Sequence, residues 1–252
     1  MIFQEMTPQI WLLEQSLWWL GCVIAIGLGI FFIIRMKKSE VSSKFMLGLA
    51  IFSFTYGAAR IIENIRKYIV SGYDNRTDIF DAWVSGSQIS GLNYWLRIAY
   101  YVIAWAGIAM FYYSSEKYVF RGKTKYAMTI ISVVEGIVSI LSYIPEDGPT
   151  LITTFAAAIG FFIATIFPIV LYARMAARNT GVLRKNCIVV AMGLAVFVFS
   201  VMCDLPESTY IVHLVGGIPL AVWITSILAP ISLFIGMLIM TLGFSRMFSD
   251  LL

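Results

Sequence analysis

Seven long apolar runs, separated by shorter polar segments, are the dominant pattern along this chain. Each run is long enough for a helix that crosses the hydrocarbon core of a bilayer, which takes roughly 20 mainly apolar residues. Transmembrane β-strands would instead be shorter segments of alternating polarity, so the pattern predicts helices. The predicted spans are Ser16–Ile34, Phe45–Ile65, Tyr94–Tyr113, Tyr126–Ile144, Leu151–Tyr172, Asn186–Cys203 and Gly217–Leu242.

Composition agrees with this pattern and predicts one transmembrane domain over residues 1–252. The 252 residues are 60% hydrophobic and 13% charged, whereas a soluble domain carries about 25% charged residues. The first run has no basic start and follows Glu5 and Glu14, so we expect a membrane span there and not a cleaved signal peptide. The predicted fold class is all-α, a polytopic membrane protein with a single seven-helix bundle.

Basic residues are concentrated in alternate loops, and this alternation predicts the orientation of the chain. Most of the 18 lysines and arginines follow the first, third, fifth and seventh runs, whereas the other loops contain only Arg66, Lys67 and Arg76. The positive-inside rule places the richly basic loops in the cytoplasm. We therefore expect an integral protein of the cell (plasma) membrane with its amino end outside and its carboxyl end in the cytoplasm.

The longest predicted loop lies outside, between about residues 66 and 93. Residues 77–84 combine cap-like polar residues with spaced apolar ones, a pattern that fits either a short amphipathic helix on the membrane surface or a loop with a membrane-resting tryptophan. Asn75 begins an Asn-Arg-Thr glycosylation sequon, and the sequence leaves its use open.

An internal repeat is a further hypothesis. Residues 48–54 of the second run (Gly-Leu-Ala-Ile-Phe-Ser-Phe) resemble residues 193–199 of the sixth (Gly-Leu-Ala-Val-Phe-Val-Phe). Arg-Met pairs end the first and fifth runs in the same way. Such matches would relate runs 1–3 to runs 5–7 with the fourth as a linker, as in transporters with parallel repeats.

Polar residues recur on one face of the second run, at steps of three and four residues that keep them aligned on a helix. Ionisable groups in hydrocarbon are costly and usually face the interior of a bundle or a cavity. Arg60 and Glu63 are three residues apart, so they can pair with each other. The residues of this face are Ser53, Tyr56, Arg60, Glu63 and Lys67.

Two further ionisable groups, Arg97 and Asp204, are predicted at the same outer level as Arg60. Arg97 and Tyr101 share a face of the third run, with Trp105 slightly displaced from it, and Asp204 ends the sixth run. Guanidinium groups bind carboxylates and stack on aromatic rings, so an outward-facing pocket for a small anionic or aromatic ligand is one interpretation. The alternative is a set of structural ion pairs, Arg60 with Glu63 and Arg97 with Asp204.

Glu135 is the ionisable residue predicted nearest the middle of the membrane. It lies in the fourth run among Ser132, Ser139 and Ser142, again at steps of three and four residues. An isolated carboxyl group at that depth is a candidate proton carrier or cation ligand. The serines also allow close contact between helices, which leaves helix packing as the alternative.

Two resemblances accompany this layout. Glu116-Lys117-Tyr118, at the inner end of the third run, resembles the acidic-basic-tyrosine triplet of G-protein-coupled receptors, although the seventh run lacks their Asn-Pro-x-x-Tyr pattern. Seven-helix sugar transporters built as three helices, a linker helix and three more are similar in length and orientation, but their paired proline motifs are not matched. The seventh run contains no lysine that could hold retinal.

The leading functional hypothesis is a receptor-like or ligand-binding membrane protein that signals through a membrane or cytoplasmic protein partner. The alternatives are a small-solute transporter and a structural subunit of a membrane complex. No catalytic motif is visible, so an enzyme is not expected. The single histidine argues against a histidine metal cluster or bis-histidine haem. We expect no cofactor, no metal and no nucleic-acid partner.

Overall fold

The computed structural model describes residues 8–36, 43–70, 91–141, 151–204 and 223–249. Within these ranges the chain is helical apart from short connections. Three π-helical turns, η1 (Ile65–Val70), η2 (Ser115–Val119) and η3 (Ile224–Leu228), adjoin α-helices. The α-helices are α1 (Pro8–Met36), α2 (Ser43–Asn64), α4 (Gly91–Ser114), α5 (Ala127–Leu141), α6 (Leu151–Arg178), α7 (Gly181–Cys203) and α9 (Ala229–Ser249).

Six of the helices are long and apolar enough to cross a membrane. The seventh, α5, is apolar over its 15 described residues. These lengths confirm an all-α protein with several helices suited to the bilayer, as the apolar runs predict. The side of the membrane on which each end lies remains a prediction.

Several helices extend further than the apolar runs. Helix α1 begins at Pro8 and not at Ser16, so Glu14 is part of it. Helix α2 continues through η1 to Val70, which places Arg66 on a helix and not in a loop. The predictions that fall on residues 75, 77–84, 142–144 and 217–222 lie outside the described residues.

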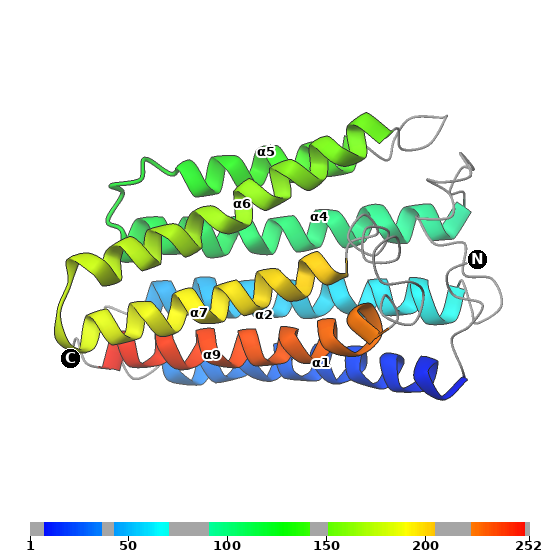
Figure 1. The fold of residues 1–252 in the computed structure, drawn as a ribbon, viewed down its shortest axis with the longest axis horizontal. Coiled ribbons are helices and arrows are strands. Elements are labelled where there is room, and N and C mark those ends of the chain that lie inside the picture. Colours follow the sequence, from blue (N-terminus) through cyan, green and yellow to red (C-terminus); the bar gives the residue numbers. More distant parts are fainter. Residues whose placement is uncertain (1–7, 37–42, 71–90, 142–150, 205–222, 250–252) are drawn as a thin grey trace.

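The helices form two rows, with each helix in contact with its neighbours in the chain. Helices α1, α2 and α4 make one row, and α9, α7 and α6 lie in front of them in that order (Figure 1). Contacts between α1 and α9 join the rows at one edge, and α5 packs beside α4 and α6 at the other. Along the second row the helices thus follow one another in the opposite direction to the first row.

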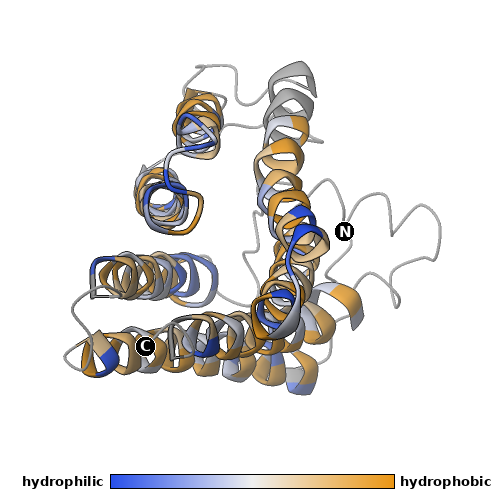
Figure 2. Cartoon of the chain, turned by 90° about the vertical axis from the view of Figure 1, so that its left-hand side faces the viewer, coloured by the Kyte–Doolittle hydropathy of each residue, from blue (hydrophilic) through white to orange (hydrophobic). Residues whose placement is uncertain are grey.

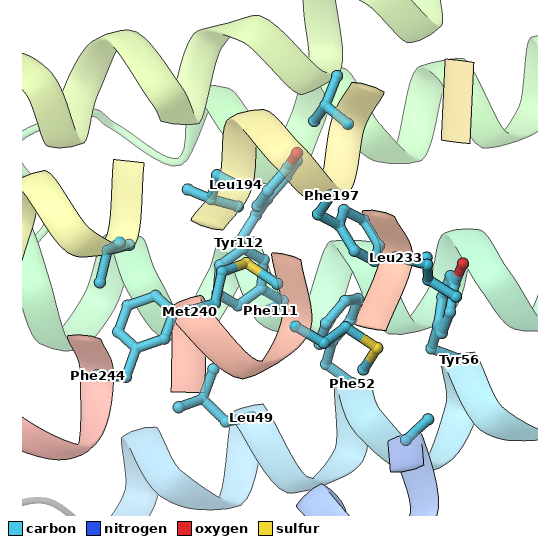
Figure 3. Close-up of a cluster of buried hydrophobic side chains, with 14 of the residues drawn as sticks. Leu49, Phe52, Tyr56, Phe111, Tyr112, Leu194, Phe197, Leu233, Met240 and Phe244 are labelled. Carbon is cyan, nitrogen blue, oxygen red and sulfur yellow. The ribbon is translucent and has the colours of Figure 1, made fainter. Parts of the chain in front are cut away.

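Side chains from α2 and α7 meet between the two rows. The rings of Phe52 and Phe197 have centroids 6.0 Å apart, and Tyr56 and Phe197 have centroids 5.3 Å apart. Leu49 and Leu194 are buried in the same cluster (Figure 3). Phe52 and Phe197, which match between the predicted repeats, thus face each other, and the matched Leu49 and Leu194 belong to the same cluster.

Glycines allow the closest approaches between helices. A Cβ atom on Gly193 would lie 2.5 Å from the Met240 backbone nitrogen, and one on Gly236 would lie 2.5 Å from that of Phe197. Helices α7 and α9 therefore touch backbone to backbone. Small residues at such interfaces are typical of membrane proteins, because the attraction between helices there comes from close packing.

The outside of the bundle is apolar along the helices. Figure 2 shows hydrophobic residues along the helical ribbons and hydrophilic ones gathered at the ends that face the viewer. Exposed apolar surface of this extent is typical of a protein whose surface contacts lipid or another protein and not water. Large apolar side chains that are exposed include Val23, Ile34, Ile130, Ile163, Met192 and Leu242.

Candidate functional site

Arg60 is the central cation of a polar cluster near the C-terminal end of α2. Its Nη1 donates to Oδ2 of Asp204 at 2.6 Å, and its Nε donates to the Tyr56 hydroxyl at 3.0 Å. Its guanidinium carbon lies 4.3 Å from the centroid of the Trp18 ring. The residue is 2% exposed, so α1, α2 and α7 meet around a buried charge.

Glu63, one turn further along α2, binds two arginines. Its Oε1 accepts from Nη2 of Arg66 at 2.7 Å and from Nη1 of Arg97 at 2.6 Å. Its Oε2 accepts from Nε of Arg66 at 2.9 Å, and Arg66 also donates to Asn93 at 3.0 Å. Arg97 donates to the Tyr101 hydroxyl at 3.0 Å. These bonds join α2 and η1 to α4.

Glu14 forms a third part of the cluster, between α1, η1 and η3. It is 1% exposed. Its Oε1 accepts from Nζ of Lys67 at 2.7 Å, and its Oε2 accepts from the Ser226 hydroxyl at 3.1 Å. We call the ten residues of these three groups the outer network: Glu14, Tyr56, Arg60, Glu63, Arg66, Lys67, Asn93, Arg97, Tyr101 and Asp204.

The structure brings together most of the predicted ligand-binding residues, but it pairs them differently. The expected Arg60–Glu63 and Arg97–Asp204 pairs are wrong: Arg60 binds Asp204, and Arg97 binds Glu63. The physical reason is that partners come from facing helices and from η1. Arg66 binds Glu63 from one side and Arg97 from another, and Asp204 at the end of α7 reaches Arg60.

Two predicted residues lie outside the outer network. Trp105 of α4 is buried against α5 and α6. Its ring centroid lies 6.0 Å from that of Phe161, and its side chain packs against Gly136. The carboxylate of Glu135 packs directly against Gly160 of α6 and accepts from the Ser139 hydroxyl at 3.3 Å. Glu135 thus lies in the contact between α5 and α6.

Sequence reasoning missed Glu14, Arg66 and Asn93 of the outer network, and also Trp18, which lies against it. Glu14 and Arg66 lie beyond the apolar runs, so they were assigned to the outside. Trp18 lies in the first run, where a tryptophan is unremarkable, and only the fold places it over Arg60. Helical spacing carries a signal for two of them. Glu14 is four residues before Trp18, and Arg66 is three residues after Glu63, so each pair shares a helix face.

A buried carboxylate at the opposite end of the bundle has a different role. Glu116 is 0% exposed and accepts from the backbone nitrogens of Met128 and Thr129 at 2.9 and 3.0 Å. It also accepts from the Thr129 hydroxyl at 2.6 Å. The first backbone N–H groups of a helix have no partner within the helix, so Glu116 caps α5 from a neighbouring element.

Buried donors without an acceptor among the described residues include Nη2 of Arg60 and Nε1 of Trp18. Among all the described residues, no three histidine, cysteine or acidic side chains are grouped so that they could hold a metal ion. Cys22, Cys187 and Cys203 are buried and free.

Comparisons with protein-family models, with curated proteins and with solved structures find no match.

Proposed function

We propose that the protein is a ligand-binding, receptor-like membrane protein whose site is the outer network. The observation that carries this proposal is the buried Arg60 guanidinium, whose Nη2 has no acceptor among the described residues. Buried donors are nearly always hydrogen-bonded in proteins. A polar ligand that accepts from this arginine would complete its bonding.

The proposed orientation puts the outer network on the non-cytoplasmic side. Arg35, Lys117 and Arg178 lie at or near the ends of α1, η2 and α6 on the opposite side of the bundle from Arg60. By the positive-inside rule these ends face the cytoplasm. The exposed Lys117 and Arg178 there offer a docking surface for the signalling partner.

The outer network joins helices of both rows, so a change in helix position caused by a ligand can be transmitted to the cytoplasmic end. Its ion pairs link α1 to η1, α2 to α4, and α2 to Asp204 after α7. A ligand shifts the equilibrium between two helix arrangements only to the extent that it binds one of them more tightly than the other. A ligand that competes for Arg60 acts on the α2–α7 contact directly.

Thermal unfolding of the purified protein in nanodiscs, against a panel of small anionic, neutral and cationic compounds, tests this function. A ligand that binds only the folded state raises the unfolding temperature, by an amount set by its concentration relative to its dissociation constant. We expect at least one stabilising compound, whose effect disappears in Arg60→Lys. Arg35→Lys is the matched control, because Arg35 bonds to a backbone oxygen at the other end of the bundle.

A small-solute transporter is the second candidate, and the two-row arrangement favours it. Contacts of α1 with α2 and of α2 with α4 have counterparts in contacts of α6 with α7 and of α7 with α9. Parallel repeats related by an axis along the membrane normal are typical of some transporters. Uptake of labelled solutes into proteoliposomes tests this candidate, and flux that requires Glu135 would favour it over the receptor.

A further inference from the structure

Arg60 and Trp18 are neighbours, and each carries a buried donor without an acceptor among the described residues. Nη2 of Arg60 and Nε1 of Trp18 are both shielded from solvent and have no hydrogen-bond partner among the described residues. The Arg60 guanidinium carbon lies 4.3 Å from the centroid of the Trp18 ring, so the two side chains are in contact. Both groups can only donate. The chemistry that satisfies them is an acceptor, and a negatively charged acceptor also matches the arginine.

Asp204 uses only part of the binding capacity of Arg60. Its Oδ2 accepts from Nη1 at 2.6 Å, whereas Nη2 receives no contact from it. A carboxylate that binds through both oxygens takes two N–H groups of a guanidinium at once and makes a stronger pair. The Asp204 side chain is 19% exposed and that of Arg60 only 3%. Asp204 is therefore the member of the pair that can exchange.

We propose that a small carboxylate-bearing ligand binds Arg60 by replacing Asp204. One ligand oxygen accepts a hydrogen bond from Nη1 of Arg60 and the other accepts from Nη2. Nε1 of Trp18 is the neighbouring donor. The exchange releases Asp204, which directly follows the last residue of α7, from α2. This inference rests on the proposed function, for which it names the class of ligand and the bond that the ligand breaks.

A ligand-observed NMR titration of the full-length protein in nanodiscs with sodium acetate tests the exchange. Trp18→Phe keeps an aromatic ring against the guanidinium but removes one donor, so the dissociation constant for acetate should rise by about tenfold. Asp204→Asn should lower it by about tenfold, because a neutral amide competes less strongly than a carboxylate for Arg60. The two variants thus have opposite expected effects.

Trp95→Phe is the matched control, since Trp95 is exposed near the start of α4 and should leave acetate binding unchanged. Acetate binding that is insensitive to Trp18→Phe, or that Asp204→Asn weakens, overturns the proposal. Chloride that competes as strongly as acetate also overturns it, because a single ion cannot supply two carboxylate oxygens. If the compound panel gives Arg60-dependent stabilisers without a carboxylate, the proposed function stands and this inference fails. If no compound in the panel stabilises the protein, both the proposed function and this inference fail.

Discussion

The Glu63 carboxylate contacts two guanidinium groups in a region closed to water. It is 7% exposed, and Arg66 and Arg97 are both buried beside it. Attraction between such charges is several times stronger than in water, but removing each charge from water costs several kcal/mol. The members of the group are therefore interdependent, and loss of one leaves the others buried without compensation.

Glu63→Gln should destabilise the protein by about 3–5 kcal/mol, because two arginines lose their shared carboxylate. Unfolding by denaturant in mixed micelles measures this change. Arg184→Gln, at an exposed position near the start of α7, should stay within about 0.5 kcal/mol of the unchanged protein. Equal stability of the two variants would show that the Glu63 pairs contribute nothing.

At the scale of residues, sequence spacing predicts faces but not partners. The steps between Tyr56, Arg60 and Glu63 fix a common direction, because the helical period does. Which residue of α4 or α7 lies opposite depends on helix tilt and on how far each helix extends, and neither is encoded in local spacing. This is why the predicted members of the site were largely found together while both predicted ion pairs were wrong.

At the scale of elements, the start of α5 depends on a residue that is not part of it. Glu116 lies in η2 and supplies the acceptors for Met128 and Thr129 across the intervening loop. A negative charge also interacts favourably with the positive end of the helix dipole. The conformation of the loop and the start of α5 are thus coupled through one carboxylate.

Glu116→Ala should destabilise the protein by about 1–2 kcal/mol, the usual cost of losing a helix cap. Hydrogen exchange of the Met128 and Thr129 amides should accelerate, because their acceptor is gone. Lys117→Gln is a suitable control, since the adjacent Lys117 is exposed and bonds only to the Tyr113 hydroxyl among the described residues. Unchanged protection of the two amides in Glu116→Ala would rule out the cap.

The α7–α9 contact gives a second prediction at this scale. Gly193→Ala places a Cβ atom against the Met240 backbone, which cannot move independently of its helix, so we expect a loss of about 1–3 kcal/mol. Gly27→Ala is the control, because nothing lies within 4 Å of a Cβ atom there. Denaturant unfolding compares them. Equal effects of the two alanines would mean that α7 and α9 are not in backbone contact.

The existence of the helices was predictable, but their ends were not. An apolar run shows where a helix crosses hydrocarbon, because each buried backbone group there must be bonded within the helix. Glu14, Arg66 and Lys67 extend helices beyond the runs because they are paired with one another or with Glu63. A hydropathy pattern contains no information about such ion pairs between residues that are distant in the sequence.

At the scale of the whole molecule, orientation is the property most directly open to test. Leu92→Cys and Arg184→Cys introduce exposed thiols at opposite ends of the bundle, whereas the three native cysteines are buried. A membrane-impermeant maleimide should label the first in intact cells and the second only after permeabilisation. The reverse pattern would invert the proposed orientation and place the outer network in the cytoplasm.

The position of α5 has a consequence for how the chain is threaded through the membrane. Helices α1 and α6 run in the same direction, as do α2 with α7 and α4 with α9 (Figure 1). Three crossings bring a chain to the side opposite its start, so a second triplet joined directly to the first would insert upside down. A single additional crossing restores the direction. Helix α5 has no counterpart in the two rows and is apolar over its 15 described residues. If α5 makes that additional crossing, both triplets enter the bilayer from the same face.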